Sequence, residues 1–301
     1  MLDIRSSAGG LKTRARDRNH RKAGGFNRRN QIVLEGEMSA RLATMGAFPY
    51  SPYCGAPPSP GDLLQRWNLD PFLISAFALI LAAYLLSSRD TPALRRLSFC
   101  VGWMLGSLAV ISPLCPLSVA LFSARVGQHL ILTSLVAPLI AMGWRPRAAT
   151  PASSHWPPIL AAITFAAMLW VWHSPAPYVA TFTSDFTYWL MHLTTFGSAV
   201  WLWYEIFSAW SERIEAAAAA IVLTSLQMGL LGAVITFAGR PLYAPHLLTA
   251  PSWGLTPLED QQFGGVLMWV PAGVIMAAAL AAGFTEALRR AEARAVARSA
   301  A

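Results

Sequence analysis

The chain has 301 residues, of which 55% are hydrophobic and 13% are charged, and its formal net charge is +8. A soluble domain is about 25% charged, so this low charged fraction is typical of a protein that has lipid as its solvent. Residues 1–44 hold ten of the 23 basic residues but only four of the 15 acidic ones. The positive charge is therefore local, which argues against nucleic-acid binding.

Seven apolar segments are long enough for membrane-crossing helices, which need about 20 mostly apolar residues each. The second segment ends at the turn 112–116, and the fourth opens with Pro157 and Pro158, which suit the first turn of a helix. Pro138 is expected to kink the third segment and to free a backbone carbonyl. The sequence predicts an all-α polytopic membrane protein, a bundle of about seven transmembrane helices within residues 65–288. The predicted spans are 71–87, 97–112, 119–142, 157–173, 186–207, 215–237 and 262–284.

Basic residues mark one side of this predicted bundle. They gather in alternate loops and in the C-terminal tail 289–301, and short loops rich in Lys and Arg stay in the cytoplasm. We therefore expect the N-terminus outside and the C-terminus inside. The residues concerned are Arg89, Arg95, Arg96, Arg145, Arg147, Arg213, Arg289, Arg290, Arg294 and Arg298.

Residues 1–60 are predicted to form a disordered tail that is basic at first and then rich in proline. Moving ten positive charges across a membrane is unfavourable, and no apolar signal sequence precedes residue 71. One hypothesis is that translation begins at Met38 or Met45, so that residues 1–44 are not translated. An organellar targeting segment is the alternative, and the four acidic residues of this stretch count against it.

The three cysteines, Cys54, Cys100 and Cys115, are scattered along the chain. The absence of a CxxC motif excludes a thioredoxin-like or zinc-ribbon site. Cys54 and Cys115 fall on the same predicted side of the membrane, where a disulfide could form. The preferred interpretation nevertheless leaves them unpaired, and Cys100 is interpreted as a small apolar residue.

Histidines gather toward the predicted outer side. His129, His173 and His192 lie on three different predicted helices, and His246 lies in the last outer loop. Imidazole suits copper, and a thioether such as that of Met268 in the seventh helix suits Cu(I), so the pattern predicts a copper site. Two alternatives stay open: each histidine hydrogen-bonds a neighbouring helix, or two of them ligate a haem iron.

A long motif precedes and enters the seventh span: WGLTPLEDQQFGG at 253–265, followed by MWVP at 268–271. Shorter motifs are WHSP at 172–175 with Tyr178, MH at 191–192 with Phe196, QH at 128–129 with APL at 137–139 and Gly143, and RPLY at 240–243. Over roughly residues 65–285 the chain resembles the caa3-type cytochrome c oxidase assembly factor family (CtaG, the seven-helix membrane type).

The resemblance implies an assembly factor for a copper-containing terminal cytochrome c oxidase, which binds or presents copper at the outer face of the plasma (inner) membrane. Its implied partners are an oxidase subunit, a copper chaperone and the lipid bilayer. An enzyme is not expected, because no P-loop, GxSxG or HExxH motif is present. The implied metal ligands are His129, His173, His192 and Met268, and the further polar site residues are Arg125, His246, Glu259, Asp260 and Gln261.

The start of the third predicted helix departs from the family pattern. The family often has Ser-x-His-Met-x-x-His, whereas residues 123–129 read SARVGQH, so that Arg125 and Val126 replace the first His and the Met. Arginine is no metal ligand, and its charge repels a copper ion. Either the chain binds metal with fewer ligands, or it has kept the fold and lost copper. A further alternative is that Arg125 pairs with Glu259 or Asp260. The alternative functions are a copper transport permease, a membrane haem-binding protein and a metal-free scaffold for an oxidase subunit.

Overall fold

The computed structural model describes residues 48–144, 156–210 and 213–299, and within these ranges the protein is helical and has no strand. The chain divides into two units, Met1–Pro49 and Tyr50–Ala301, and the described helices all belong to the second. The all-α prediction is thereby confirmed for this part of the chain. The predictions about residues 1–44, about a start at Met38 or Met45, and about Arg145 and Arg147 lie outside the described residues.

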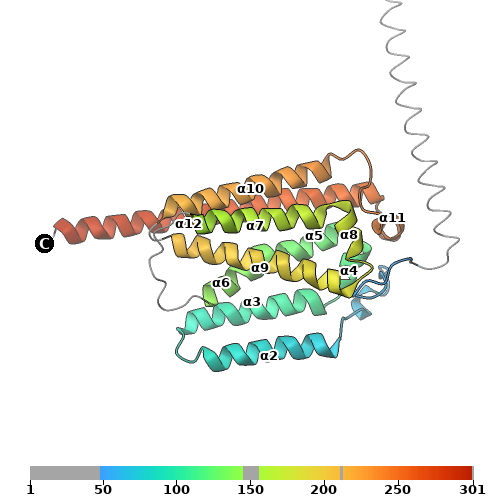
Figure 1. Ribbon diagram of the computed structural model, residues 1–301, viewed down its shortest axis with the longest axis horizontal. Coiled ribbons are helices and arrows are strands. Elements are labelled where there is room, and N and C mark those ends of the chain that lie inside the picture. The colour runs from blue at the N-terminus through green and yellow to red at the C-terminus, as the bar shows by residue number, and fades with distance from the viewer. Residues whose placement is uncertain (1–47, 145–155, 211–212, 300–301) are drawn as a thin grey trace, which may run out of the picture. The chain divides into compact units, whose positions relative to one another are not determined.

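The long helices of the second unit lie alongside one another (Figure 1). Each packs on the next in the order α12, α10, α7, α9, α6, α3 and α2, and α5 packs on α12. The elements are η1 (Leu63–Gln65), α2 (Pro71–Ser87), α3 (Ala93–Ile111), α4 (Leu114–Ala120), α5 (Phe122–Ile131), η2 (Leu132–Val136), α6 (Ala137–Gly143), α7 (Trp156–His173), α8 (Pro175–Ala180), α9 (Asp185–Ala209), α10 (Ile214–Thr236), α11 (His246–Thr249), η3 (Ala250–Trp253) and α12 (Pro257–Ser299).

Each predicted span corresponds to a helix or a run of helices, with differences at the ends. The predicted turn at 112–116 is short, because α4 already begins at Leu114. The seventh span was predicted as 262–284, yet α12 runs from Pro257 to Ser299. Its extra turns hold the polar residues 259–261 at one end and the arginine-rich segment 289–298 at the other, where hydropathy alone predicts no span.

Five described helical segments are long and apolar enough to cross a membrane: Ala93–Ile111, Phe122–Gly143, Trp156–His173, Ile214–Thr236 and Pro257–Ser299. The apolar helix α2 is shorter, with 17 residues. Helix α9 has 25 residues, but it does not reach the same apolarity, since polar side chains such as Asp185, His192 and Glu205 interrupt it. The count of seven spans and the sides of the termini stay predictions.

The third predicted span is interrupted at its middle. A π-helical turn, η2, separates α5 from α6, and Pro138 follows it in the first turn of α6. A π-helix pairs each carbonyl with the N–H five residues later, and Pro138 has no N–H to offer Thr133. The indole nitrogen of Trp203 on α9 donates to the Thr133 carbonyl instead, at 2.9 Å. The carbonyl freed by Pro138 is thus used to hold α9.

A disulfide joins Cys54 to Cys115, with the two Cα atoms 5.5 Å apart. The interpretation that left these cysteines unpaired is therefore wrong, while Cys100 is a free cysteine. The segment before α2 folds back onto the bundle, where the Tyr53 ring stacks on Tyr188 at 5.1 Å. The backbone of Asn68 also donates to the Ile111 carbonyl. The part of the predicted tail from residue 50 onward thus includes residues that contact the bundle.

The disulfide predicts a simple labelling pattern. Under denaturing, non-reducing conditions a maleimide-linked polymer should add once to the chain, at Cys100, and three times after reduction, as seen by gel mobility. The Cys100→Ser variant should add none before reduction and two after it. Three additions without reductant would contradict the disulfide.

Candidate functional site

Three predicted metal ligands come together near one end of the bundle. His129 is on α5, His173 ends α7 and His192 is on α9. The ring centroids of His129 and His192 are 5.2 Å apart, and those of His129 and His173 are 6.5 Å apart. Helices that are well separated in sequence thus place three imidazoles side by side.

Backbone carbonyls orient two of these rings. The Nδ1 of His173 lies 2.8 Å from the Leu169 carbonyl, and the Nδ1 of His192 lies 3.1 Å from the Tyr188 carbonyl. A carbonyl only accepts, so each Nδ1 carries the hydrogen and each Nε2 keeps its lone pair. This is how metal-binding histidines are commonly held. Within the described residues, the Nε2 atoms of His129 and His192 are buried without a hydrogen-bond partner.

The arrangement is a histidine pair with a third ring beside it. In the described part of the chain, no group of three or more His, Cys, Asp or Glu side chains is placed to hold one metal ion. The fourth predicted ligand, Met268, is buried on α12, which packs against α5 and α10. A metal ion at the pair would therefore have His129 and His192 as its ligands.

Arg125 lies one turn before His129 on α5 and is only 4% exposed. Its Nη2 donates to the Thr181 hydroxyl at 2.6 Å, and its guanidinium carbon lies 4.8 Å from the Tyr178 ring centroid and 4.6 Å from that of Phe182. Aromatic faces attract a cation in this way. The suggested ion pair with Glu259 or Asp260 does not form, because other groups occupy both carboxylates.

Glu259 and Thr256 form a capping box at the start of α12. The carboxylate of Glu259 accepts from the backbone N–H and the hydroxyl of Thr256, both at 2.8 Å, and the Glu259 N–H donates back to that hydroxyl at 3.2 Å. This reciprocal pattern satisfies donors that a helix start leaves free. Glu259 was predicted as a further polar residue of the site, and its side chain caps its own helix.

Asp260 caps a different helix, α5. Its carboxylate accepts from the backbone N–H of Phe122 at 2.7 Å and from both the N–H and the hydroxyl of Ser123, at 3.1 and 2.5 Å. The residue before α5 is Leu121, which has no side-chain acceptor, so α5 has no cap of its own. A carboxylate at a helix N-terminus is favoured by the free N–H groups and by the helix dipole.

Gln261 fastens the connection between α10 and α12. Its side-chain oxygen accepts from the Leu242 N–H at 2.6 Å, and its amide donates to the carbonyls of Ile235 and Arg240 at 3.2 and 3.4 Å. At Gly264, a Cβ atom would lie 2.5 Å from the Phe122 ring. Asp260, Gln261 and Gly264 of the long motif thus set the position of α12 against its neighbours.

His246 is held by two hydrogen bonds. Its Nε2 lies 2.6 Å from the Tyr178 hydroxyl, and its Nδ1 lies 3.3 Å from the Ala120 carbonyl. Burial, together with the positive charge of Arg125, lowers the pKa of His246 to about 3, so the ring is neutral near pH 7. With Nδ1 donating to the carbonyl and Nε2 accepting from the tyrosine, neither nitrogen is left for a metal.

Tyr188 also belongs to the site, although its sequence pattern was not used to predict it. Its ring lies 4.3 Å from that of His192, and its hydroxyl lies 3.3 Å from the sulfur of Cys54 and 3.6 Å from that of Cys115. It therefore fills the space between the disulfide and the histidine pair. Tyr188 lies four residues before His192, and residues at this spacing share one face of a helix, so the sequence does indicate that the two side chains are neighbours.

The fold and this site define a class: an all-helical protein with several membrane-length apolar helices and a polar cluster buried among them. The family model for the cytochrome c oxidase caa3 assembly factor (Caa3_CtaG) matches residues 77–290. The chain belongs to this family, which confirms the resemblance. No curated protein and no solved structure matches the chain.

The capping role of Asp260 predicts a loss of stability. Asp260→Ala leaves the buried N–H groups of Phe122 and Ser123 without an acceptor, which should cost about 2–3 kcal/mol. The Glu259→Ala control removes an exposed cap and should cost about 1 kcal/mol. Thermal unfolding of the purified protein in detergent measures both, and equal losses would contradict the assignment.

The Tyr178–His246 bond predicts a second stability effect. Tyr178→Phe leaves the His246 Nε2 buried without its donor, at a cost of about 1–3 kcal/mol at pH 7, where His246 is neutral. The double variant Tyr178→Phe, His246→Phe should recover part of this loss, since no orphaned acceptor remains. The same unfolding assay tests it, and additive losses would refute the pairing.

Proposed function

We propose that this chain serves the assembly of a copper-containing terminal cytochrome c oxidase by holding copper, as cargo, between His129 and His192. The main support is that the Nε2 atoms of His129 and His192 are buried without hydrogen-bond partners in the described residues, on rings whose centroids are 5.2 Å apart. Imidazole is a good copper ligand. With metal–nitrogen bonds of about 2 Å, two rings on one ion have centroids within about 6.5 Å of each other.

Arg125 favours a singly charged cargo. Its guanidinium sits one helical turn before His129, in surroundings from which water is largely excluded. Repulsion between charges grows with their product, so Cu(I) is opposed half as strongly as Cu(II). A site with two neutral imidazole ligands and a nearby cation holds its ion weakly. That is suited to passing copper on rather than to storing it.

The disulfide and the arginines support the predicted sidedness. Disulfides persist in oxidising compartments, so the end of the bundle near Cys54 and Cys115 is assigned to the outside. Arg95 and Arg96 begin α3, whose other end leads to Cys115, so these basic residues belong to the opposite side. The proposed topology is a multi-pass protein of the plasma membrane with seven spans, N-terminus outside, and copper at the outer face.

A metal-free scaffold for an oxidase subunit is the second candidate. The absence, in the described ranges, of a three-ligand group favours it, as does Arg125 at a position where the family often has histidine. Both candidates assign the chain to assembly rather than to catalysis. They differ in whether the purified chain binds copper at all.

A Cu(I) competition assay with a coloured chelator separates the two. The wild-type chain should bind one ion, and His129→Ala or His192→Ala should weaken binding by about 10- to 100-fold or more. Arg125→Met should tighten binding by removing the positive charge, whereas the charge-preserving control Arg125→Lys should not.

The cellular test measures copper in the purified oxidase after deletion of the gene. Copper content and oxidase activity should both fall, and the wild-type gene, but not the His129→Ala variant, should restore them. Normal copper in the oxidase of the deletion strain would refute the copper proposal. Restoration by His129→Ala, together with no Cu(I) binding by the purified chain, would identify the scaffold.

A further inference from the structure

An exposed apolar segment, residues 63–69, precedes α2. Its side chains Leu64, Trp67 and Leu69 are 82%, 49% and 66% exposed, and Phe72 in the first turn of α2 is 88% exposed. The indole N–H of Trp67 donates to the Leu64 carbonyl at 3.1 Å, which holds the ring beside the Leu64 backbone. A large apolar area is therefore left uncovered at the start of α2.

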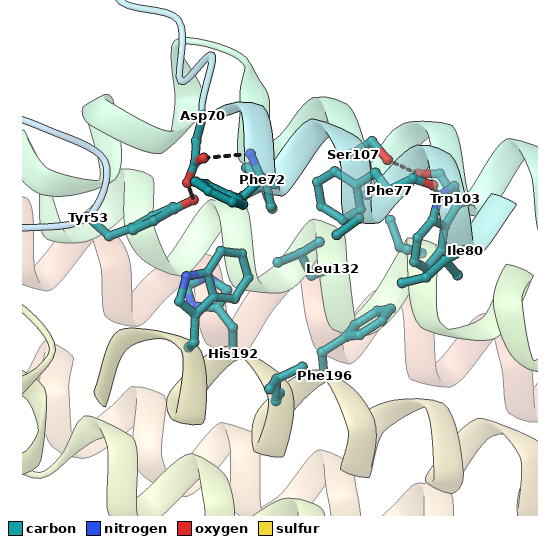
Figure 2. A pocket seen from close by; sticks show the side chains of 17 residues that line it. Tyr53, Asp70, Phe72, Phe77, Ile80, Trp103, Ser107, Leu132, His192 and Phe196 are labelled. Carbon is teal, nitrogen blue, oxygen red and sulfur yellow. Dashed lines mark hydrogen bonds between the residues drawn. The ribbon is translucent and has the colours of Figure 1, made fainter. Parts of the chain in front are cut away.

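Hydrogen bonds fix the level of this segment relative to the helices. The Asn68 N–H donates at 2.8 Å to the carbonyl of Ile111, the last residue of α3. Asp70 caps α2, because its carboxylate accepts from the Phe72 N–H at 2.9 Å, and it also accepts from the Tyr53 hydroxyl (Figure 2). Helix α3 is long and apolar enough to cross a membrane. With α3 in the membrane, the segment lies where α2 and α3 reach the boundary of the bilayer.

Helix α2 alone is shorter than the hydrocarbon core of a bilayer. Its 17 residues span about 25 Å, whereas the core is about 30 Å thick. The residues that follow α2, 88–91, read SRDT and are polar, so the missing length is not supplied at that end. At the other end the chain continues with Leu69, Trp67 and Leu64. Apolar and aromatic residues that flank a short span commonly act as interfacial anchors.

The polar groups of the segment are paired within the protein. The Nε and Nη2 atoms of Arg66 both donate to one carboxylate oxygen of Asp62, at 2.9 and 2.6 Å. The other oxygen of Asp62 accepts from the N–H and the hydroxyl of Ser59, at 2.6 and 2.8 Å. A polar group that keeps its hydrogen bonds loses less free energy when it leaves bulk water. These pairs therefore lower the cost of placing the segment against lipid.

We infer that residues 63–69 lie in the headgroup region of the bilayer and anchor the start of α2, with their three exposed apolar side chains in contact with lipid. The partner of this surface is lipid because the surface continues into Phe72 and along α2, whose only residue in the buried class is Leu73. The inference requires that α3 crosses a membrane. It does not rest on the copper proposal or on which side of the membrane the segment lies.

The test uses the full chain in lipid nanodiscs with one fluorescent label. In a Cys100→Ser background the disulfide leaves no free thiol, so Leu64→Cys or Leu69→Cys takes a single label. Leu79→Cys, at the midpoint of α2 and 70% exposed, is the reference for the lipid interior. Ser299→Cys, exposed at the end of α12, is the reference for water. All four replaced side chains are exposed, so their loss removes little packing.

Lipids that carry a spin label at a known depth quench the fluorophore and report its position. The labels at Leu64 and Leu69 should lie about 15 Å from the bilayer centre, at the boundary of the hydrocarbon core. The label at Leu79 should lie within about 5 Å of the centre, because it is at the middle of the helix. The label at Ser299 should be quenched by iodide in the water and by none of the lipids.

Three results would overturn the inference. Labels at Leu64 and Leu69 that respond to iodide but not to lipid, while Leu79 responds to lipid, would leave this surface to a protein partner. Labels at Leu64 and Leu69 as deep as the one at Leu79 would place the segment inside the hydrocarbon. A label at Leu79 that iodide reaches would remove α2 from the membrane. An intact disulfide confirms that each variant is folded, and if one of the two leucine variants lacks it, the other decides.

Discussion

The contact between Asp260 and the first residues of α5 is the constraint on which the candidate site depends. Helix α5 starts inside the protein at Phe122, where water cannot satisfy its free N–H groups. The residue before it offers no cap, and the carboxylate of α12 takes that place. The rest of the site is built on this fixed helix start, since Arg125 and His129 follow on α5.

Phe122 extends this constraint to the neighbouring elements. Its ring stacks on Tyr243 at 4.2 Å and meets the rings of Tyr178 at 5.8 Å and His246 at 6.2 Å. The Ala120 carbonyl, just before α5, accepts from Thr249 and faces His246. The segments between α7 and α9 and between α10 and α12 thereby both contact the start of α5.

Two buried charged side chains are stabilised separately at this helix start. The N–H groups and the dipole of α5 stabilise the Asp260 carboxylate, which comes from α12. The rings of Tyr178 and Phe182 stabilise the guanidinium of Arg125, which is on α5.

Hydropathy and spacing were enough to predict the helices and the grouping of His129, His173 and His192, because both follow from the apolar composition of the segments and from helical geometry. The roles of Glu259 and Asp260 were not predicted. The pattern Thr256-x-x-Glu259 is a readable capping box, but Asp260 acts on a helix 138 residues away, which no local pattern indicates. The disulfide was missed for the same reason, since its cysteines are separated by 61 residues. Pro138 did predict a freed carbonyl, but not that Trp203 would use it.

The bond between Cys54 and Cys115 has a consequence for α2. Both α2 and α3 lie within the covalent ring that this bond closes. Helix α2 packs chiefly on α3, and Leu73 is its only residue in the buried class. Weakly packed elements open at low free energy. When so lightly packed a helix opens, the disulfide keeps the segment before it attached to the start of α4, which limits how far α2 can move.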